Sequence, residues 1–152
     1  MGLWSSGYDV ASTWRISPVR IWSGPLFYSE FLKMQRSFKK LVVWKIAQDF
    51  ALETGKIAKK IADPVISNQL RLASISISSY ISKGAAMKSE RDFLKFINLA
   101  AGSVNECENL LIFAKDLNYL DAEEFNSLTS ESEKLRAMLF KLMESISSQN
   151  SK

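Results

Sequence analysis

The sequence contains no histidine and only one cysteine among its 152 residues. Without histidine there can be no Ser-His or Cys-His nucleophile pair, no imidazole acid or base and no histidine-ligated zinc. A single cysteine excludes an internal disulfide and a cysteine-rich metal site. Carboxylates, lysines and hydroxyls remain for chemistry, and we expect no enzymatic activity, no cofactor and no metal.

The overall composition is that of an ordinary globular protein, with 47% hydrophobic and 24% charged residues. A chain of this length can bury one core without disulfides, which predicts a single main domain. Cys107 falls on an apolar helical stripe, so we expect it to be a small buried hydrophobic residue. A lone free thiol fits a reducing compartment, and we expect a cytoplasmic protein.

Residues 1–34 differ from the rest because they carry three of the four tryptophans, with glycine and proline scattered among them. They lack the continuous apolar run of a secretory signal and are too interrupted by Arg15 and Arg20 to span a bilayer. Two interpretations stay open: a poorly ordered or non-native extension upstream of Met34, or an aromatic arm that docks on the rest of the chain or on a partner. We expect no membrane interaction, a bundle domain over residues 35–147 and a frayed tail over residues 148–152.

The centre of the chain holds two apolar stripes at helical spacing, separated by a short turn over residues 84–88. The segment Ser74-Ile75-Ser76-Ile77-Ser78 alternates like a strand, but the stripe around it is longer than this alternation, and length favours a helix. Ser89 with Asp92 is typical of an N-cap with an acidic third residue. The two stripes are Ile66, Leu70, Ala73, Ile77 and Ile81, then Phe93, Phe96, Ile97, Ala100, Val104, Cys107, Leu111 and Ala114.

Two further helices flank this central pair. The first is predicted over residues 37–62, with Ser37 as N-cap, Gly55 marking a close helix contact or a bend, and Asp63-Pro64 ending it. After a turn over residues 116–120, Asp121 with Glu124 repeats the N-cap pattern and a fourth helix runs to residue 147. Short turns join antiparallel neighbours, so the sequence predicts an all-α, up-down-up-down four-helix bundle.

Apolar residues also occur off these stripes. Because a monomeric bundle rarely exposes a large apolar patch, they favour self-association. They are Leu72, Ile75, Leu94, Ile112, Phe113, Phe140 and Met143.

Charge is distributed unevenly along the chain. Residues 33–95 carry thirteen Lys or Arg against five Asp or Glu, a net charge of +8, whereas residues 101–152 carry five against nine, a net charge of −4. The basic half can attract a polyanion, or oppositely charged halves can meet in neighbouring subunits.

Several motifs together resemble one known family. They are Phe38-x-x-Leu41-x-x-Trp44, then Gln69-Leu70-Arg71 with Ala73, Ser76, Ile77, Ile81 and Gly84, then Phe93-x-x-Phe96 with Ala100-x-Gly102-Ser103-x-x-Glu106-x-Glu108, and Leu117-Asn118-Tyr119-Leu120. From about Phe38 to Leu142 the chain resembles the four-helix-bundle family typified by the 23S rRNA intervening-sequence protein. It more distantly resembles the accessory variability determinant of diversity-generating retroelements.

This resemblance implies a bacterial protein that forms a closed ring, commonly of five subunits, with a poorly defined role associated with RNA. Where the family usually reads Ser-Ile-Pro-x-Asn-Ile-Ala-Glu-Gly, this chain has Ser78, Tyr80, Ser82 and Lys83 in place of proline, asparagine, alanine and glutamate. Any role of that asparagine or glutamate is therefore in doubt here.

The sequence is compatible with three functions. The first is a homo-oligomer that binds RNA or DNA backbone without sequence readout, since no stacking platform or recognition helix is evident. The second is a structural or adaptor oligomer for a protein partner. The third, an enzyme using Ser103, Glu106 and Glu108, is disfavoured because carboxylates two residues apart on a helix point in different directions. The candidate phosphate-binding residues are Lys39, Lys40, Lys45, Lys56, Lys59, Lys60, Arg71, Lys83, Lys88, Arg91 and Lys95. The candidate interface or structural residues are Trp44, Gln69, Arg71, Ser76, Gly84, Ser103 and Glu106.

Overall fold

The computed structural model describes residues 37–149, and within this range all regular secondary structure is helical. A 3₁₀ turn, η2 (Phe38–Lys40), leads into α3 (Val42–Ala58), followed by α4 (Pro64–Ala85), α5 (Glu90–Asp116) and α6 (Ala122–Gln149). The predictions for residues 1–34 and for residues 150–152 lie outside the described range.

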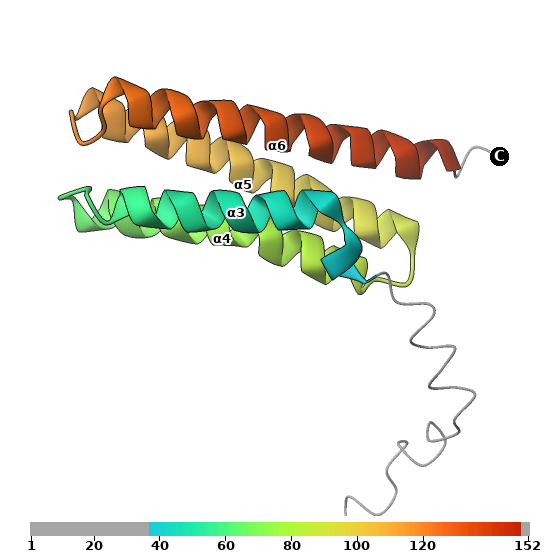
Figure 1. Ribbon diagram of the computed structural model, residues 1–152. Helices are drawn as coiled ribbons and strands as arrows, with labels where there is room; N and C mark the ends of the chain where they lie inside the picture. Colours follow the sequence, from blue (N-terminus) through green and yellow to red (C-terminus); the bar gives the residue numbers. More distant parts are fainter. Residues whose placement is uncertain (1–36, 150–152) are drawn as a thin grey trace, which may run out of the picture. The chain divides into compact units, whose positions relative to one another are not determined.

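The four helices form the predicted antiparallel bundle (Figure 1). Each helix packs on the next in sequence, and α3 also contacts α6, although less extensively. None of the helices within residues 37–149 is both long and apolar enough to cross a membrane.

The core is built from the predicted stripes, except that Phe96 is partly exposed and lies outside the buried cluster. Ile77, Ile81, Ile97 and Leu111 are fully buried, and α6 adds Leu135 and Leu139. Burial of such side chains contributes roughly 1.5–3 kcal/mol each, so this shared interior is the main source of stability.

The serine-rich segment of α4 is helical, as predicted, and the serine hydroxyls form hydrogen bonds that are compatible with a helix. Ser74 donates to the Arg71 carbonyl at 2.9 Å, and Ser78 donates to the Ile75 carbonyl at 3.1 Å. Three further serines of α4 donate in the same way one turn back. These local bonds satisfy the serine side chains inside the helix, so packing of the isoleucines decides the conformation.

Capping at the turns follows the sequence signals. Ser89 accepts from the Asp92 amide at 3.0 Å, and Asp121 accepts from the Glu124 amide at 2.8 Å, which confirms both N-caps. After α5, Asn118 takes a positive φ of 59°, and the Tyr119 amide donates back to the Ala114 carbonyl at 2.8 Å. This is a Schellman turn, in which asparagine occupies the left-handed position.

Several predicted boundaries are wrong. The first helix begins at Val42 and ends at Ala58, because η2 precedes it and Ser37 makes no side-chain cap. Asp63 does more than end a helix, since its carboxylate caps α4 by accepting from the amides of residues 65 and 66, with Pro64 as the first helical residue.

The glycines also differ from expectation. Gly84 lies inside the last turn of α4, so the connection is shorter than residues 84–88. A Cβ built on Gly55 would meet no atom within 4 Å, so Gly55 marks no close helix contact.

The last helix is longer than predicted, because α6 continues two residues past the predicted limit of 147.

Candidate nucleic-acid interface

The site begins with η2, which an aromatic contact fixes to α3. Phe38 meets Trp44 edge to face, with ring centroids 4.9 Å apart, and Leu41 and Trp44 pack against the core. The motif Phe38-x-x-Leu41-x-x-Trp44 is therefore an anchor. It holds Lys39 and Lys40 at the end of the bundle where α4 finishes.

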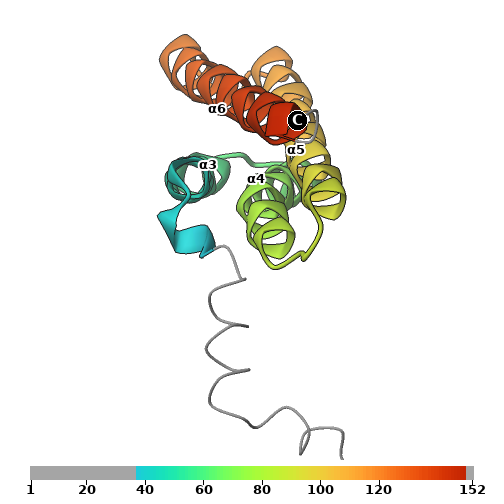
Figure 2. The same cartoon turned by 90° about the vertical axis from the view of Figure 1, so that its right-hand side faces the viewer.

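Seven candidate cations gather at this end, which we call the basic end. Figure 2 looks onto it and shows η2, the end of α4 and the start of α5, with the C-terminal end of α6 above α4. Residues 37–45 and 83–95 contain seven Lys or Arg against only Glu90 and Asp92, a net charge of +5. All seven cationic residues are exposed. They are Lys39, Lys40, Lys45, Lys83, Lys88, Arg91 and Lys95.

Only one of these seven forms an ion pair within the described residues. Lys95 contacts Asp92 at 2.8 Å, and this hydrogen bond, together with that from Ser89, lowers the pKa of the Asp92 carboxyl. The pair is exposed and within one helix, so it contributes little to stability. Lys83 instead lies over the Tyr80 ring, 5.4 Å from its centroid. Two of the positions that depart from the family pattern are thus in contact.

The other four candidate cations are elsewhere, so the structure does not unite the predicted set. Lys56 pairs with Glu53 at 2.9 Å, and Lys60 pairs with Glu124, which raises the pKa of Lys60. They belong to the opposite end, where residues 53–63 and 115–124 carry four lysines against six carboxylates. Lys59 and Arg71 line a shallow groove of about 270 Å³ between α3 and α4.

The predicted interface residues have separate surroundings. Gln69 and Glu106 are exposed, and Ser103 is buried on α5. Ser76 bonds the backbone of its own helix. Gly84 is buried at the α4–α5 contact, where an added Cβ would lie 2.8 Å from Phe96 Cβ.

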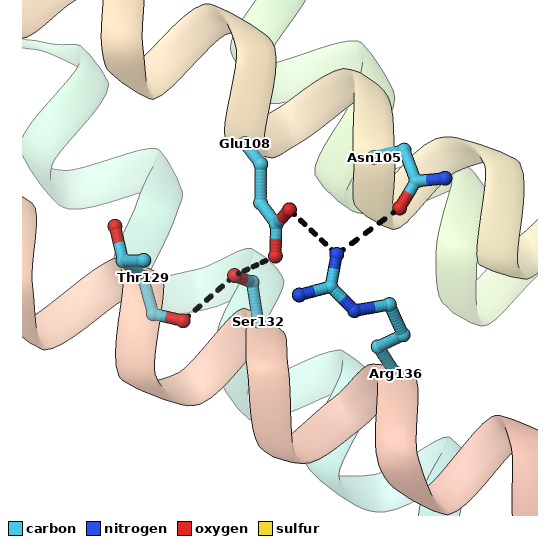
Figure 3. Close-up of polar contacts among 5 residues, drawn as sticks. All are labelled: Asn105, Glu108, Thr129, Ser132 and Arg136. Carbon is cyan, nitrogen blue, oxygen red and sulfur yellow. Dashed lines mark hydrogen bonds and ion pairs between the residues drawn. The ribbon is translucent and has the colours of Figure 1, made fainter.

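A polar network joins α5 to α6 through Glu108, not Glu106 (Figure 3). Glu108 accepts from Ser132 at 2.9 Å and from Arg136 Nη1 at 2.7 Å, and the same nitrogen also donates to Asn105 at 3.3 Å. Ser132 is fully buried, and its hydroxyl also lies 2.8 Å from the Thr129 carbonyl, so the single hydroxyl proton is shared between the two acceptors. Glu106 is exposed and takes no part in this network, so its predicted place at a helix or subunit interface stays a prediction.

One part of this network could have been predicted from the sequence. Ser132 and Arg136 are four residues apart and so share one face of α6. Their partner on α5 depends on the register of the two helices, which the sequence pattern alone does not give.

Within residues 37–149 no three carboxylate or thiol groups come close enough to hold a metal ion. A groove of about 310 Å³ between α3 and α6 is lined by Asp49, Glu53, Ser127 and Glu131. Two of these carboxylates are paired with lysines of their own helices, Glu53 with Lys56 and Glu131 with Lys134. Cys107 is fully buried, as predicted. Burial, and to a lesser extent the negative charges of Glu106 and Glu108, raise the pKa of its thiol to about 12.

These features define an antiparallel four-helix bundle with a cationic end surface. The family model described as "23S rRNA-intervening sequence protein" matches residues 39–141, and the chain belongs to this family. It is also similar to a solved structure from Bacteroides thetaiotaomicron, described as a protein with unknown function from the S23 ribosomal protein family. The two chains share 24% identity over 67% of this chain and 98% of that one, with a TM-score of 0.65, which shows a common fold. No curated protein matches the sequence.

Proposed function

We propose that the protein is a non-enzymatic, cytoplasmic homo-oligomer that binds the phosphate backbone of RNA or DNA through its basic end. The observation that carries this proposal is the gathering of cations from η2, α3, α4 and α5 on one end, where residues 37–45 and 83–95 carry a net charge of +5. Six of the seven have no carboxylate partner within the described residues, so they are available to phosphate oxygens.

The physics of the interaction is electrostatic. A polyanion releases condensed counterions when lysine or arginine neutralises its phosphates, and this release supplies non-specific affinity. The opposite end has more carboxylates than lysines and would repel a phosphate backbone. The nucleic acid is therefore expected to contact η2 and the α4–α5 turn rather than the α3–α4 turn.

Self-association would multiply this surface. Leu72 and Ile75 on α4, Ile112 and Phe113 on α5 and Phe140 on α6 are all about half exposed or more. Large apolar side chains left in water in this way favour an interface between subunits, and a ring would repeat the basic end once per subunit. The pentamer implied by the family resemblance remains part of this proposal.

Titration of a labelled RNA hairpin at low and then moderate salt tests the proposal. We expect binding at low salt that weakens steeply as salt is added, with little dependence on the hairpin sequence. Absence of binding even at low salt would refute it. The measurement should be paired with the mass of the particle in solution, which reports the oligomer.

The second candidate is an adaptor for a protein partner. It is favoured by the groove between α3 and α4, where exposed Leu52 and Ile75 form an apolar lining beside Lys59 and Arg71. A protein recovered with the chain after nuclease treatment, together with no affinity for RNA, would favour this function.

A further inference from the structure

A pair of aromatic rings lies beside the cations of the basic end. Tyr80 on α4 and Phe96 on α5 have ring centroids 6.4 Å apart with a tilt of 37° between the rings. Both side chains are partly exposed. Tyr80 packs against the core, which fixes its position, whereas Phe96 is not among the residues packed on the buried cluster.

Gly84 makes this arrangement possible. A Cβ at this position would lie 2.8 Å from Phe96 Cβ and 2.9 Å from Phe93 Cδ2, closer than real contacts allow. The absence of a side chain lets α5 approach α4 closely enough to place Phe96 next to Tyr80. The ring pair is thus held by the packing of two helices and is not a feature of a loop.

A cation accompanies the rings. Lys83 Nζ lies 5.4 Å from the centroid of the Tyr80 ring, a cation–π distance. Lys95, the neighbour of Phe96 in sequence, is also exposed, and Lys88 and Arg91 occupy the nearby turn and the start of α5. An aromatic surface beside several cations is the arrangement by which proteins hold single-stranded nucleic acids, with a base on the ring and phosphates on the cations.

We infer that Tyr80 and Phe96 form a stacking site for an unpaired base of RNA or DNA, with Lys83 contacting an adjacent phosphate. This inference rests on the proposed nucleic-acid binding and narrows its ligand to single-stranded segments or loops. Bases inside a duplex are already stacked and cannot reach a side-chain ring, whereas splayed bases can.

The test compares a labelled oligouridylate with an RNA duplex, both titrated at the same low salt. The variants are Tyr80→Leu and Phe96→Leu, which keep an apolar side chain and remove the aromatic face. The matched control is Tyr119→Leu, a partly buried tyrosine packed on the core in the turn after α5, at the opposite end. Thermal unfolding of each variant verifies that it is folded.

We expect Tyr80→Leu to lower the affinity for the single strand about tenfold, since loss of one stacked base has an effect of this size. Its affinity for the duplex should be unchanged. Tyr119→Leu should change neither. Unaltered single-strand affinity in folded Tyr80→Leu and Phe96→Leu would overturn the stacking site and leave the proposed function standing. If the unsubstituted protein binds neither RNA, the stacking site and the proposed function are both overturned.

Photo-crosslinking gives an independent readout that does not depend on any substitution. Oligouridylate carrying 4-thiouridine should crosslink to the peptides that contain Tyr80 or Phe96. Crosslinks found only on other peptides would overturn the inference even if affinity changes in the variants.

Discussion

Gly84→Ala should destabilise the bundle, although alanine is the better helix former. In a helix interior, alanine is favoured over glycine by about 1 kcal/mol. Opposing this gain, the new methyl would lie 2.8 Å from Phe96 Cβ and 2.9 Å from the buried Phe93 ring. Phe96 Cβ is attached directly to the backbone of α5, so relief requires α4 and α5 to move apart.

Overpacking of this kind typically costs about 1–3 kcal/mol, and the rigid contact places Gly84→Ala in the upper part of that range. After the helix-propensity gain, we expect a net loss of about 1–2 kcal/mol of unfolding free energy. For a chain of this size, each kcal/mol corresponds to a fall of about 2–4 °C in Tm.

Two other glycines provide matched controls. Gly55 and Gly102 are helical, and an added Cβ at either would meet nothing within 4 Å. Gly55→Ala and Gly102→Ala should therefore stabilise the protein by up to about 1 kcal/mol. Urea unfolding at one fixed protein concentration measures all three, because the stability of an oligomer depends on concentration. A Gly84→Ala variant as stable as the two controls would refute the reasoning.

The same structure gives further predictions for Glu108, Cys107 and Asn118. Glu108→Ala should lower the unfolding free energy by about 1–2 kcal/mol, because the bonds from Ser132 and Arg136 to this carboxylate are lost and only their weaker or local acceptors remain. The exposed Glu106→Ala should change it by less than about 0.5 kcal/mol; urea unfolding measures both. Cys107 should react with a thiol reagent at pH 8 only after unfolding, since its pKa is about 12 and the side chain is buried; rapid labelling of the folded protein would contradict this. Because that pKa is raised by folding, the thiol's contribution to stability should decrease as the pH rises from 9.0 toward 12. Asn118→Gly should be neutral or stabilising and Asn118→Val destabilising by at least about 1 kcal/mol in thermal unfolding, because this residue holds a φ of 59°.

Much of the fold could be predicted because its signals are local and repeated. The 3.6-residue period identified all four helices, and even the serine-rich part of α4 followed from the length of its stripe. Helix ends were less accessible. Asp63-Pro64 was interpreted only as a stop, although an Asp before Pro is also a start, and η2 gave no periodic signal before Val42.

The candidate site could be predicted only in part, because it depends on topology. The excess of lysine and arginine was visible in the sequence, but the chain separates its cations between two ends of the bundle. Lys39 and Lys88 lie at the same end of the bundle because α3 and α4 are antiparallel. Lys60 lies among carboxylates at the other end. The Glu108 network and the contact of Tyr80 with Phe96 require the register between helices, which the pattern of one helix does not contain.

The central claim is that the basic end, and not the overall positive charge, binds nucleic acid. The most direct measurement compares two variants that lose the same charge: Lys83→Gln/Lys88→Gln/Arg91→Gln at the basic end and Lys56→Gln/Lys59→Gln/Lys60→Gln at the opposite end. For each, the affinity for one labelled RNA hairpin is measured over a range of salt concentrations. We expect the slope of log affinity against log salt to become less steep by about two to three in the first variant and to stay unchanged in the second. Equal losses in both variants, or a larger loss in the second, would contradict it.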